Sequence, residues 1–194
     1  RLDIAGLEVG YDGPSGLHDD TSILFSARHL DFGRVFDMIG SPEIGRPVLS
    51  DVILKTDTRL NASNTLNVLA IYAPEKYDRT AENVLQSDDD EPGNFEDITL
   101  VDIDRDNTLL ALSWTHLVGK NAEWLNQLYY RDYDEKTATG ELYPDRVALG
   151  SPLGDIPIRE NILSAFKQEK EMGWRSDYSV DNFLGRLSLG LRYS

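Results

Sequence analysis

Asp and Glu together number 34 in this 194-residue chain, against 19 Lys and Arg and three His, so their carboxylates are the first candidates for chemistry. Four of them stand in a row: Asp88, Asp89, Asp90 and Glu91. Carboxylate oxygens bind hard cations such as Ca²⁺, but this row lacks the spaced ligand pattern of an EF-hand loop. Runs of like charge usually stay in solvent. We therefore favour a solvated loop over a cation site here.

Histidine chemistry and nucleophilic catalysis find little support in the sequence. His18, His29 and His116 are far apart and lack the i, i+4 spacing of a helical metal pair, so we interpret them as core or interface residues. Cysteine is absent, which excludes disulfides and thiol catalysis. No nucleophile elbow, P-loop or glycine-rich dinucleotide motif occurs. A glycosidase pair stays open because carboxylates are so numerous, but nothing singles out two of them. We predict a protein that is not an enzyme and has no cofactor.

The overall charge narrows the classes of partner. The formal net charge is −15, and residues 75–106 hold twelve acidic against three basic side chains. A chain without a basic stripe cannot neutralise phosphates, so we predict no nucleic-acid partner. The sequence starts at Arg1 without Met and has no apolar run of about 18 residues, so we expect a processed chain or a fragment without a membrane-spanning helix.

A hairpin in the middle of the chain is the clearest structural element. Apolar and polar residues alternate from Asp51 to Leu60, and the alternation resumes from Thr65 to Tyr72 after the polar turn at 61–64. Alternation with a period of two predicts strands with one apolar and one charged face. The charged face suits either water or the polar lumen of a barrel.

The same pattern predicts about eight antiparallel strands over residues 1–194. Their expected ranges are 2–12, 21–30, 51–60, 65–73, 107–117, 123–133, 162–178 and 186–194. Long connections are expected at 31–50, with one short amphipathic helix, at 74–106 and at 134–157. Asp102, Asp104 and Asp106 alternate with other residues and favour an extension of the strand at 107–117 over a ligand set. Connections that alternate between short and long are typical of outer-membrane β-barrels.

Aromatic residues gather near both predicted ends of these strands. Near the short turns are Tyr11, Trp114, Trp124, Trp174 and Tyr178, and near the long connections are Tyr72, Tyr130 and Tyr193. Two such belts are expected of a barrel whose ends lie at the two membrane interfaces. In a barrel, the charged rows would face the lumen, and they include Arg28, Lys55, Asp57, Arg59 and Arg175. These charged side chains could interact with one another and with water in the lumen, or they could contact another domain. The sequence leaves both possibilities open.

Four segments, in this order and spacing, resemble the barrel domain of TonB-dependent outer-membrane receptors. They are residues 21–28 (TSILFSAR), 47–51 (PVLSD), 64–72 (NTLNVLAIY) and 107–116 (NTLLALSWTH). The resemblance implies an all-β transmembrane barrel, 22-stranded in the family, of which this chain would supply about eight strands. The 194 residues contain no stretch that resembles the family's plug domain with its energy-coupling box, so we expect the chain to be a piece of such a receptor.

The resemblance also implies a function and partners. Such receptors lie in the outer membrane of Gram-negative bacteria and take up a scarce nutrient, such as an iron chelate, cobalamin or a saccharide. The expected partners are outer-membrane lipid, a plug domain, the remaining barrel strands, the TonB complex acting through the plug, and a small-molecule substrate. Substrate contacts are expected from the outer loops at 31–50, 74–106 and 134–157, and the lumen rows would meet the plug.

Two alternatives stay open. Eight strands could close on themselves as a small outer-membrane barrel with a structural or adhesive role, which requires pairing between the strands around Leu7 and Leu189. A soluble all-β ligand-binding or hydrolytic domain is the other alternative. It requires the Leu66, Val68, Leu110 and Leu112 side chains to point into a dry protein core.

Overall fold

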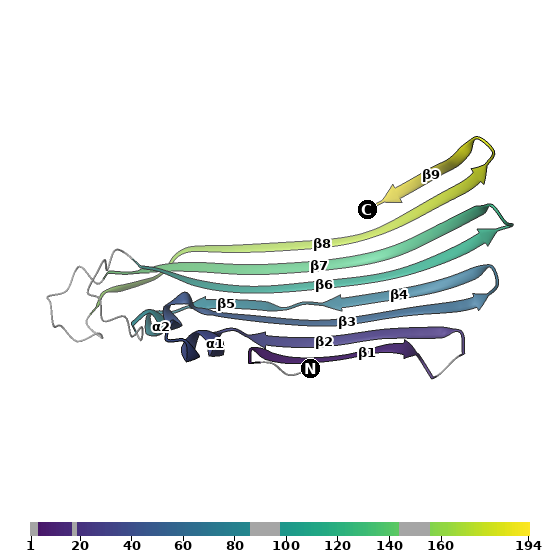
Figure 1. Cartoon of the computed structure of the whole chain (residues 1–194). Coiled ribbons are helices and arrows are strands. Elements are labelled where there is room, and N and C mark those ends of the chain that lie inside the picture. Colours follow the sequence, from purple (N-terminus) through teal and green to yellow (C-terminus); the bar gives the residue numbers. More distant parts are fainter. Residues whose placement is uncertain (1–3, 17–18, 86–97, 144–155) are drawn as a thin grey trace.

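The computed structural model describes residues 4–16, 19–85, 98–143 and 156–194, which form one nine-stranded antiparallel sheet with three short helical segments (Figure 1). The elements are β1 (Gly6–Pro14), β2 (Thr21–Asp31), α1 (Gly33–Met38), η1 (Pro42–Ile44), β3 (Arg46–Asn61), β4 (Asn64–Tyr72), β5 (Glu75–Arg79), α2 (Ala81–Leu85), β6 (Ile98–Val118), β7 (Ala122–Leu142), β8 (Ile158–Asn182) and β9 (Gly185–Tyr193). The prediction of an all-β antiparallel architecture is confirmed.

The strands follow one another across the sheet in the order β1-β2-β3-β4-β6-β7-β8-β9. The short strand β5 pairs with both β3 and β6, as β4 does, so β4 and β5 lie end to end between the same two neighbours (Figure 1). The interruption falls at Ala73 and Pro74, where proline has no N–H to donate to a ladder. The Pro74 carbonyl still accepts from the Ser50 N–H at 3.1 Å, which keeps the two pieces in line.

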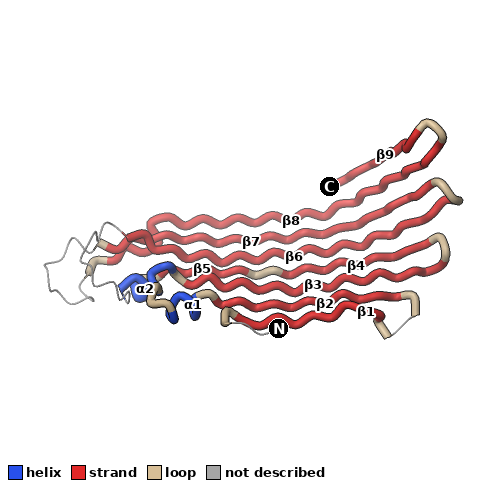
Figure 2. The backbone as a smooth tube through the Cα atoms, in the orientation of Figure 1, coloured by secondary structure: helices blue, strands red, loops and turns tan. Residues whose placement is uncertain are grey.

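The two ends of the sheet differ in their connections. All of the short turns lie at one end, and α1, η1 and α2 lie at the other, as the helical segments in Figure 2 show. The predicted central hairpin is confirmed. Its turn is held by the Asn61 Oδ1 atom, which accepts from the Ser63 N–H at 3.0 Å and from the Asn64 Nδ2 atom at 2.8 Å. We call the end with the short turns the near end and the end with the helices the far end.

The far ends of the strands extend beyond the predicted ranges. β6 begins at Ile98, β7 continues to Leu142 and β8 begins at Ile158, so much of the expected connections 74–106 and 134–157 is strand. Within 31–50, the expected short helix is α1, and β3 already starts at Arg46. The predicted extension of the fifth strand through Asp106, Asp104 and Asp102 is confirmed. Pairing with β5 and β7 satisfies the backbone N–H and C=O groups of this segment. The segment therefore forms a strand although aspartates occupy the face where an apolar row would otherwise lie.

Strand register places the predicted apolar rows on a single face. Directly opposed residues of antiparallel strands share a face, and Phe25, Leu54 and Ala70 are opposed in sequence across β2, β3 and β4. The row continues through Leu110, Tyr130 and Met172 on β6, β7 and β8. We call this side the apolar face and the opposite side the polar face.

Along β6 and β7 the apolar face divides into three zones. Nearest the short turns is a band that on β6 contains Leu110, Leu112 and Trp114, and on β7 contains Trp124, Leu128 and Tyr130. Next, with the same side-chain parity, is a charged zone of Asp102, Asp104, Asp106, Asp132, Asp134 and Lys136. At the far end, Leu100 and Leu142 continue that parity. We call the first zone the apolar band.

The small hydrophobic core of the described residues lies at the far end and not under the apolar band. It consists of Val84, Leu100, Leu142 and Ile156, with Ala81 packed against it, and Leu142 has no exposed surface. In the apolar band, by contrast, Leu128 is 54% exposed and Met172 is 75% exposed. The sheet therefore covers its apolar face at one end only.

The described strands form an open sheet. β1 pairs with β2 and β9 pairs with β8, and these two edge strands do not pair with each other. In Figure 1, β9 lies beside the end of β8 at one edge of the sheet, and β1 lies at the opposite edge. Among the described residues, no helix is long and apolar enough to cross a membrane.

Candidate functional site

The charged residues predicted to share one face do so. Arg28 and Asp51 are directly opposed on β2 and β3, and the Arg28 Nη2 atom lies 2.6 Å from the Asp51 Oδ1 atom. Lys55 and Asp57 follow on β3, with their charged atoms 3.1 Å apart. Arg59 lies on the same polar face. Arg175 on β8 also lies on this face, and its Nε atom is 2.5 Å from the Asp177 carboxylate. The sheet places Arg28, Lys55, Asp57 and Arg59 on one face of the adjacent strands β2 and β3, and it leaves Arg175 separated from them by β4, β6 and β7.

Beyond the apolar band, a carboxylate–guanidinium ladder crosses β5, β6 and β7 on the polar face. Arg105 donates from its Nη1 atom to Glu75 at 2.7 Å and from its Nε atom to Glu135 at 2.8 Å. The Tyr133 hydroxyl also donates to Glu135. This hydroxyl and then the Arg105 guanidinium lower the pKa of the Glu135 carboxyl, and the two carboxylates raise the pKa of Arg105. The ladder links three adjacent strands through charge-assisted hydrogen bonds.

A second polar cluster joins β7, β8 and β9. The Tyr129 hydroxyl donates to Glu171 at 2.6 Å, and the Arg192 Nη2 atom donates to the Tyr129 hydroxyl at 3.0 Å. The Tyr129 ring lies over Gly173, where an added Cβ atom would be 2.4 Å from the ring. Gly173 therefore provides the space in which the ring packs flat against the sheet. We interpret this cluster as a structural clasp, because its hydrogen-bonding groups satisfy one another.

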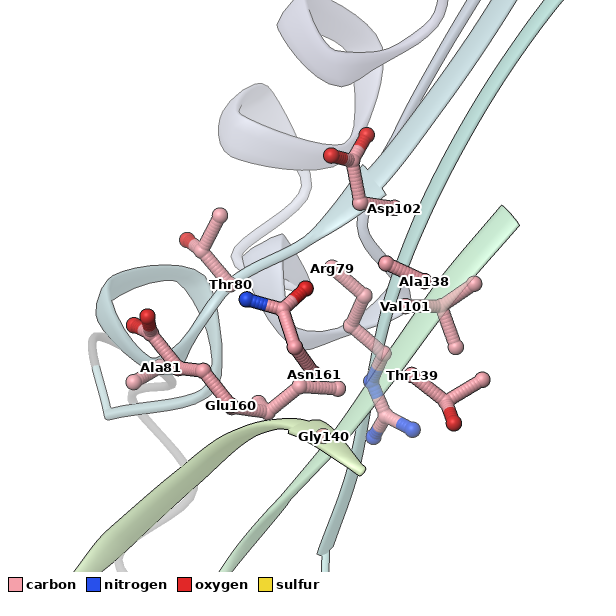
Figure 3. A pocket seen from close by; sticks show the side chains of 11 residues that line it. Arg79, Thr80, Ala81, Val101, Asp102, Ala138, Thr139, Gly140, Glu160 and Asn161 are labelled. Atoms are coloured by element: carbon pink, nitrogen blue, oxygen red, sulfur yellow. The ribbon is translucent and has the colours of Figure 1, made fainter. Parts of the chain in front are cut away.

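At the far end, residues from four stretches of the chain line a half-open cavity of about 250 Å³ (Figure 3). They are Arg79, Thr80, Ala81, Leu100, Val101, Asp102, Ala138, Thr139, Gly140, Glu160 and Asn161. Arg79, Val101 and Thr139 are opposed in sequence across β5, β6 and β7, so their side chains belong to the polar face. Leu100, Asp102, Ala138 and Gly140 have the opposite parity and belong to the apolar face.

The Arg79 side chain, on the polar face, is held by backbone oxygens. Its Nε atom donates to the Glu43 carbonyl at 2.7 Å, and its Nη1 atom donates to the Thr99 carbonyl at 3.3 Å. No carboxylate of the described residues lies within ion-pair distance of it. The two carbonyls fix the guanidinium in place without neutralising its charge.

The opposite wall of the cavity is built from an irregularity in the β7–β8 ladder. Between Thr139 and Glu141 the partner residue moves from Leu163 to Arg159, so β8 accommodates extra residues there. Asn161 lies in this bulge with a φ of 53°, and a Cβ atom on Gly140 would lie 2.8 Å from the Arg159 carbonyl oxygen. Bulges re-aim side chains and are frequent beside functional sites. This one places Asn161 and Glu160 at the cavity (Figure 3).

The other predicted chemical groups lie elsewhere. The acidic row at 88–91 and His18 are outside the described residues. The His29 Nδ1 atom is 2.8 Å from the Ser50 hydroxyl. The His116 Nδ1 atom is 2.9 Å from the Asn64 Oδ1 atom, and its ring stacks on Trp114. Within the described ranges, no group of three or more His, Asp or Glu side chains is arranged to hold a metal ion.

Comparison with known proteins yields no relative: no family model, no curated protein and no solved structure matches the chain.

Sequence reasoning did not identify the cavity. Arg79 and Gly140 fell inside the predicted connections 74–106 and 134–157, and Asn161 lay just before the predicted strand 162–178. Glu75, Tyr77 and Arg79 occupy every second position of β5, and Val101 and Ile103 do the same on β6. This period of two is the signal that pairs β5 with β6. No local pattern in the sequence marks the bulge at Asn161.

Proposed function

We propose that this chain is part of the wall of an outer-membrane β-barrel receptor of the TonB-dependent type, which takes up a scarce small-molecule nutrient. The observation that carries the proposal is the apolar band. Aliphatic and aromatic side chains occupy one face of every strand of the β1–β4 and β6–β9 path, and most are exposed.

The size of this exposed surface argues for a lipid environment. Monomeric soluble proteins rarely expose contiguous apolar patches above a few hundred Å², and this band spans the sheet from Val9, 52% exposed, to Leu191, 70% exposed. A membrane-spanning strand needs about 9 to 11 residues. On β6 the band with its aromatic margin covers the stretch from Thr108 to Leu117, which has that length.

The polar face fits the lumen of such a barrel. Its ion pairs, including Arg28–Asp51, Lys55–Asp57 and Arg175–Asp177, are half-exposed and suit contact with water or with a polar plug domain. The open edges at β1 and β9 support a wall of a larger barrel over a self-closed barrel of eight strands. Further strands and a plug of the parent protein would complete the receptor, and the TonB complex would act through the plug.

The far end is the proposed outer side, where substrate is captured. There the strands continue past the apolar band, and the cavity beside Arg79 opens among them. In this orientation, Trp114, Trp124 and Tyr178 lie at the periplasmic interface and Tyr72 and Tyr130 at the outer one, as in aromatic belts. Trp174 and Tyr193, expected in opposite belts, are instead directly opposed on β8 and β9 at the level of Leu128.

Adjacent substitutions on the two faces of β6 test the proposal. In phospholipid vesicles, Leu112→Arg is expected to lower the free energy of unfolding by roughly 2 to 4 kcal/mol, because it places a charge in the hydrocarbon. Ser113→Arg, on the polar face, is expected to cost no more than about 1 kcal/mol, the loss of the neutral hydrogen bond from Gln127. Denaturant titration of the intact parent protein measures both.

Two results would overturn the proposal. Equal, small effects of Leu112→Arg and Ser113→Arg would mean that both faces meet water. A large effect of Leu112→Arg, in a parent protein that is recovered soluble from the periplasm without detergent, would mean that the band packs against protein in a soluble domain.

A further inference from the structure

We infer that a lipid bilayer contacts the apolar face along an oblique belt, which moves toward the near end from β1 to β9, so that the strands are tilted by about 35° from the membrane normal. This belt rests on the proposed function, in which lipid covers the apolar band. It adds the depth in the membrane at which each side chain of the band lies.

One row of directly opposed residues on the apolar face starts apolar at one edge of the sheet and ends charged near the other. From β1 to β8 it runs through Val9, Ala27, Val52, Tyr72, Thr108, Asp132 and Lys170. Val9 is 52% exposed, whereas Lys170 and Asp132 form an ion pair. A belt at constant register would keep one character along such a row. The apolar band therefore crosses the strands obliquely.

The centre of the band moves by about one residue per strand. Its members at the two edges of the sheet are Leu7, Val9 and Tyr11 on β1, and Leu187, Leu189, Leu191 and Tyr193 on β9. The first group is centred on Val9, whose row reaches β8 at Lys170, and the second on Gly190, which is opposed to Asp177 of β8. This is a drift of about seven residues over the seven steps between neighbouring strands. At about 3.3 Å per residue and about 4.8 Å per step, it corresponds to a tilt of about 35°, as in transmembrane barrels.

The far margin of the band moves in the same direction as its centre. The first Asp, Glu, Lys or Arg that follows the band on the apolar face is Asp31 on β2 and Lys170 on β8. The row of Asp31 reaches β8 at Phe166, which is four residues farther from the near end than Lys170. The charged zone thus begins closer to the near end on β8 than on β2.

The near margin follows, so the band keeps its width. β2 begins at Thr21, whose row reaches β8 at Ser176, and β8 continues six residues farther to Asn182. The stretch from the charged margin to the near-end turn is about ten residues on β2 and about twelve on β8, or roughly 27 to 32 Å along the membrane normal at this tilt. A hydrocarbon core is about 30 Å thick. Parallel margins at this spacing fit a bilayer, which is a slab, and are not required of a protein partner.

The oblique belt also explains why two aromatic residues are directly opposed. The centre of the band lies near Ser176 on β8 and at Gly190 on β9, so Trp174 and Tyr193 both lie on the far side of it. They join Tyr72 and Tyr130 toward the outer interface. The Trp and Tyr side chains on the near side of the centre are Tyr11, Trp114, Trp124 and Tyr178. Each interface thus receives four of the large amphipathic rings that favour it.

Spin labels on the intact parent protein in phospholipid vesicles test the belt, with depth measured from collisions with oxygen and with a water-soluble nickel chelate. The 194 residues contain no cysteine, so each introduced cysteine gives one label in this part of the protein. Leu54, Leu110 and Met172 belong to one row. We expect the label of Leu54→Cys to lie about 11 Å deeper than that of Met172→Cys, with Leu110→Cys between them.

A second row is expected to show the opposite trend across the sheet. Val118 on β6 and Leu187 on β9 are joined through Ala122 and Val180. The label of Leu187→Cys is expected about 8 Å deeper than that of Val118→Cys, because the belt lies closer to the near end on β9. Ser113→Cys, on the polar face of β6, is the control and is expected to show no contact with lipid.

Equal depths within each row, or trends of the opposite sign, would overturn the oblique belt. If the labels still collide mainly with oxygen in that case, the apolar face meets lipid at constant register and the barrel wall of the proposed function stands. Labels on both rows that collide with the nickel chelate as freely as in water would show that this face meets no lipid. The belt and the proposed function would then fail together.

Discussion

The near and far ends of the sheet use the same face of the same strands in opposite ways. On β7, Leu128 and Leu142 have the same parity and differ by fourteen positions along one strand. Leu128 is 54% exposed, whereas Leu142 is fully buried against Val84, Leu100 and Ile156. Between them lie Asp132, Asp134 and Lys136, which face the same side. On the far side of the charged zone the apolar side chains are buried, and on its near side they are exposed.

Under the proposed function, this difference means that the two ends are adapted to different solvents. At the far end, α2 and Ile156 cover Leu100 and Leu142 and form a hydrophobic core with them. A domain in water must bury its apolar face in this way. The near end has no such cover in the described structure, although its apolar row is far longer. A bilayer removes the need for a cover, because hydrocarbon solvates leucine as well as another leucine does. In the proposed barrel, the charged zone would mark the level at which the strands leave the membrane.

The largest expected effect that separates the two ends comes from leucine-to-alanine substitution on β7. Leu142→Ala should leave a cavity in the far-end core and destabilise that end by roughly 2 to 5 kcal/mol. Leu128→Ala should cost less, because lipid chains fill the space that the side chain vacates. Hydrogen exchange of the protein in bilayers measures both, at the amides of the far and near halves of β6 and β7.

The pattern of exchange decides whether the ends are independent. We expect Leu142→Ala to speed exchange near Leu100 and to leave amides near Leu112 unchanged. Faster exchange over the whole length of β6, or equal costs for the two substitutions, would mean that the sheet has one continuous environment and would contradict the comparison.

The near end could be predicted from sequence because contrast between faces is greatest there. In β3, β4 and the second half of β6, apolar and polar residues alternate, and this period of two defined the central hairpin and the shared face of Arg28, Lys55 and Asp57. The far halves of β6 and β7 carry charges or threonines on both faces, as in Asp104, Arg105 and Asp106. Without an apolar row, such a strand has the composition of a loop, and only its pairing partners show what it is.

The far-end cavity was beyond local sequence reasoning for a different reason. Arg79, Gly140 and Asn161 come from three segments, and these segments line one cavity because β5 fills the space beyond β4 and because β8 bulges opposite Thr139. The break at Pro74 could have suggested that a second strand follows β4. The bulge has no comparable signal, since Asn161 is an ordinary polar residue whose φ of 53° is set by the ladder around it.

Acidic pH should loosen the far end before the near end. The Tyr133 hydroxyl and Arg105 lower the pKa of Glu135 in the folded protein. A carboxyl whose folded-state pKa is below its unfolded value adds stability above the unfolded pKa and loses it as the pH falls through the folded one. Protection of β5, β6 and β7 amides at the Glu75–Arg105–Glu135 ladder should therefore fall as the pH drops below the ordinary glutamate range.

Glu135→Gln is the variant that assigns this effect. It removes the titrating carboxyl, so the difference in protection between wild type and variant should be greatest near neutral pH and should shrink as the pH falls. A difference that is constant with pH would show that the ladder does not titrate with folding. The near-end amides around Leu112 serve as the internal reference in the same samples.

The smallest expected effect concerns the polar face at the near end, and it distinguishes a wet lumen from a covered one. Arg28 and Asp51 are 2.6 Å apart, with 48% and 15% of their side-chain surfaces exposed. In a double-mutant cycle with Arg28→Gln and Asp51→Asn, a pair in contact with water should show a coupling energy of about 0.2 to 1 kcal/mol. The cycle should be measured by denaturant titration in vesicles, first at low and then at high salt, since screening weakens an exposed pair.

A salt-insensitive coupling well above this range would place the pair under protein, as a plug against the barrel wall would do. The same cycle at Lys55 and Asp57, both more than a third exposed, gives the wet reference on the same face.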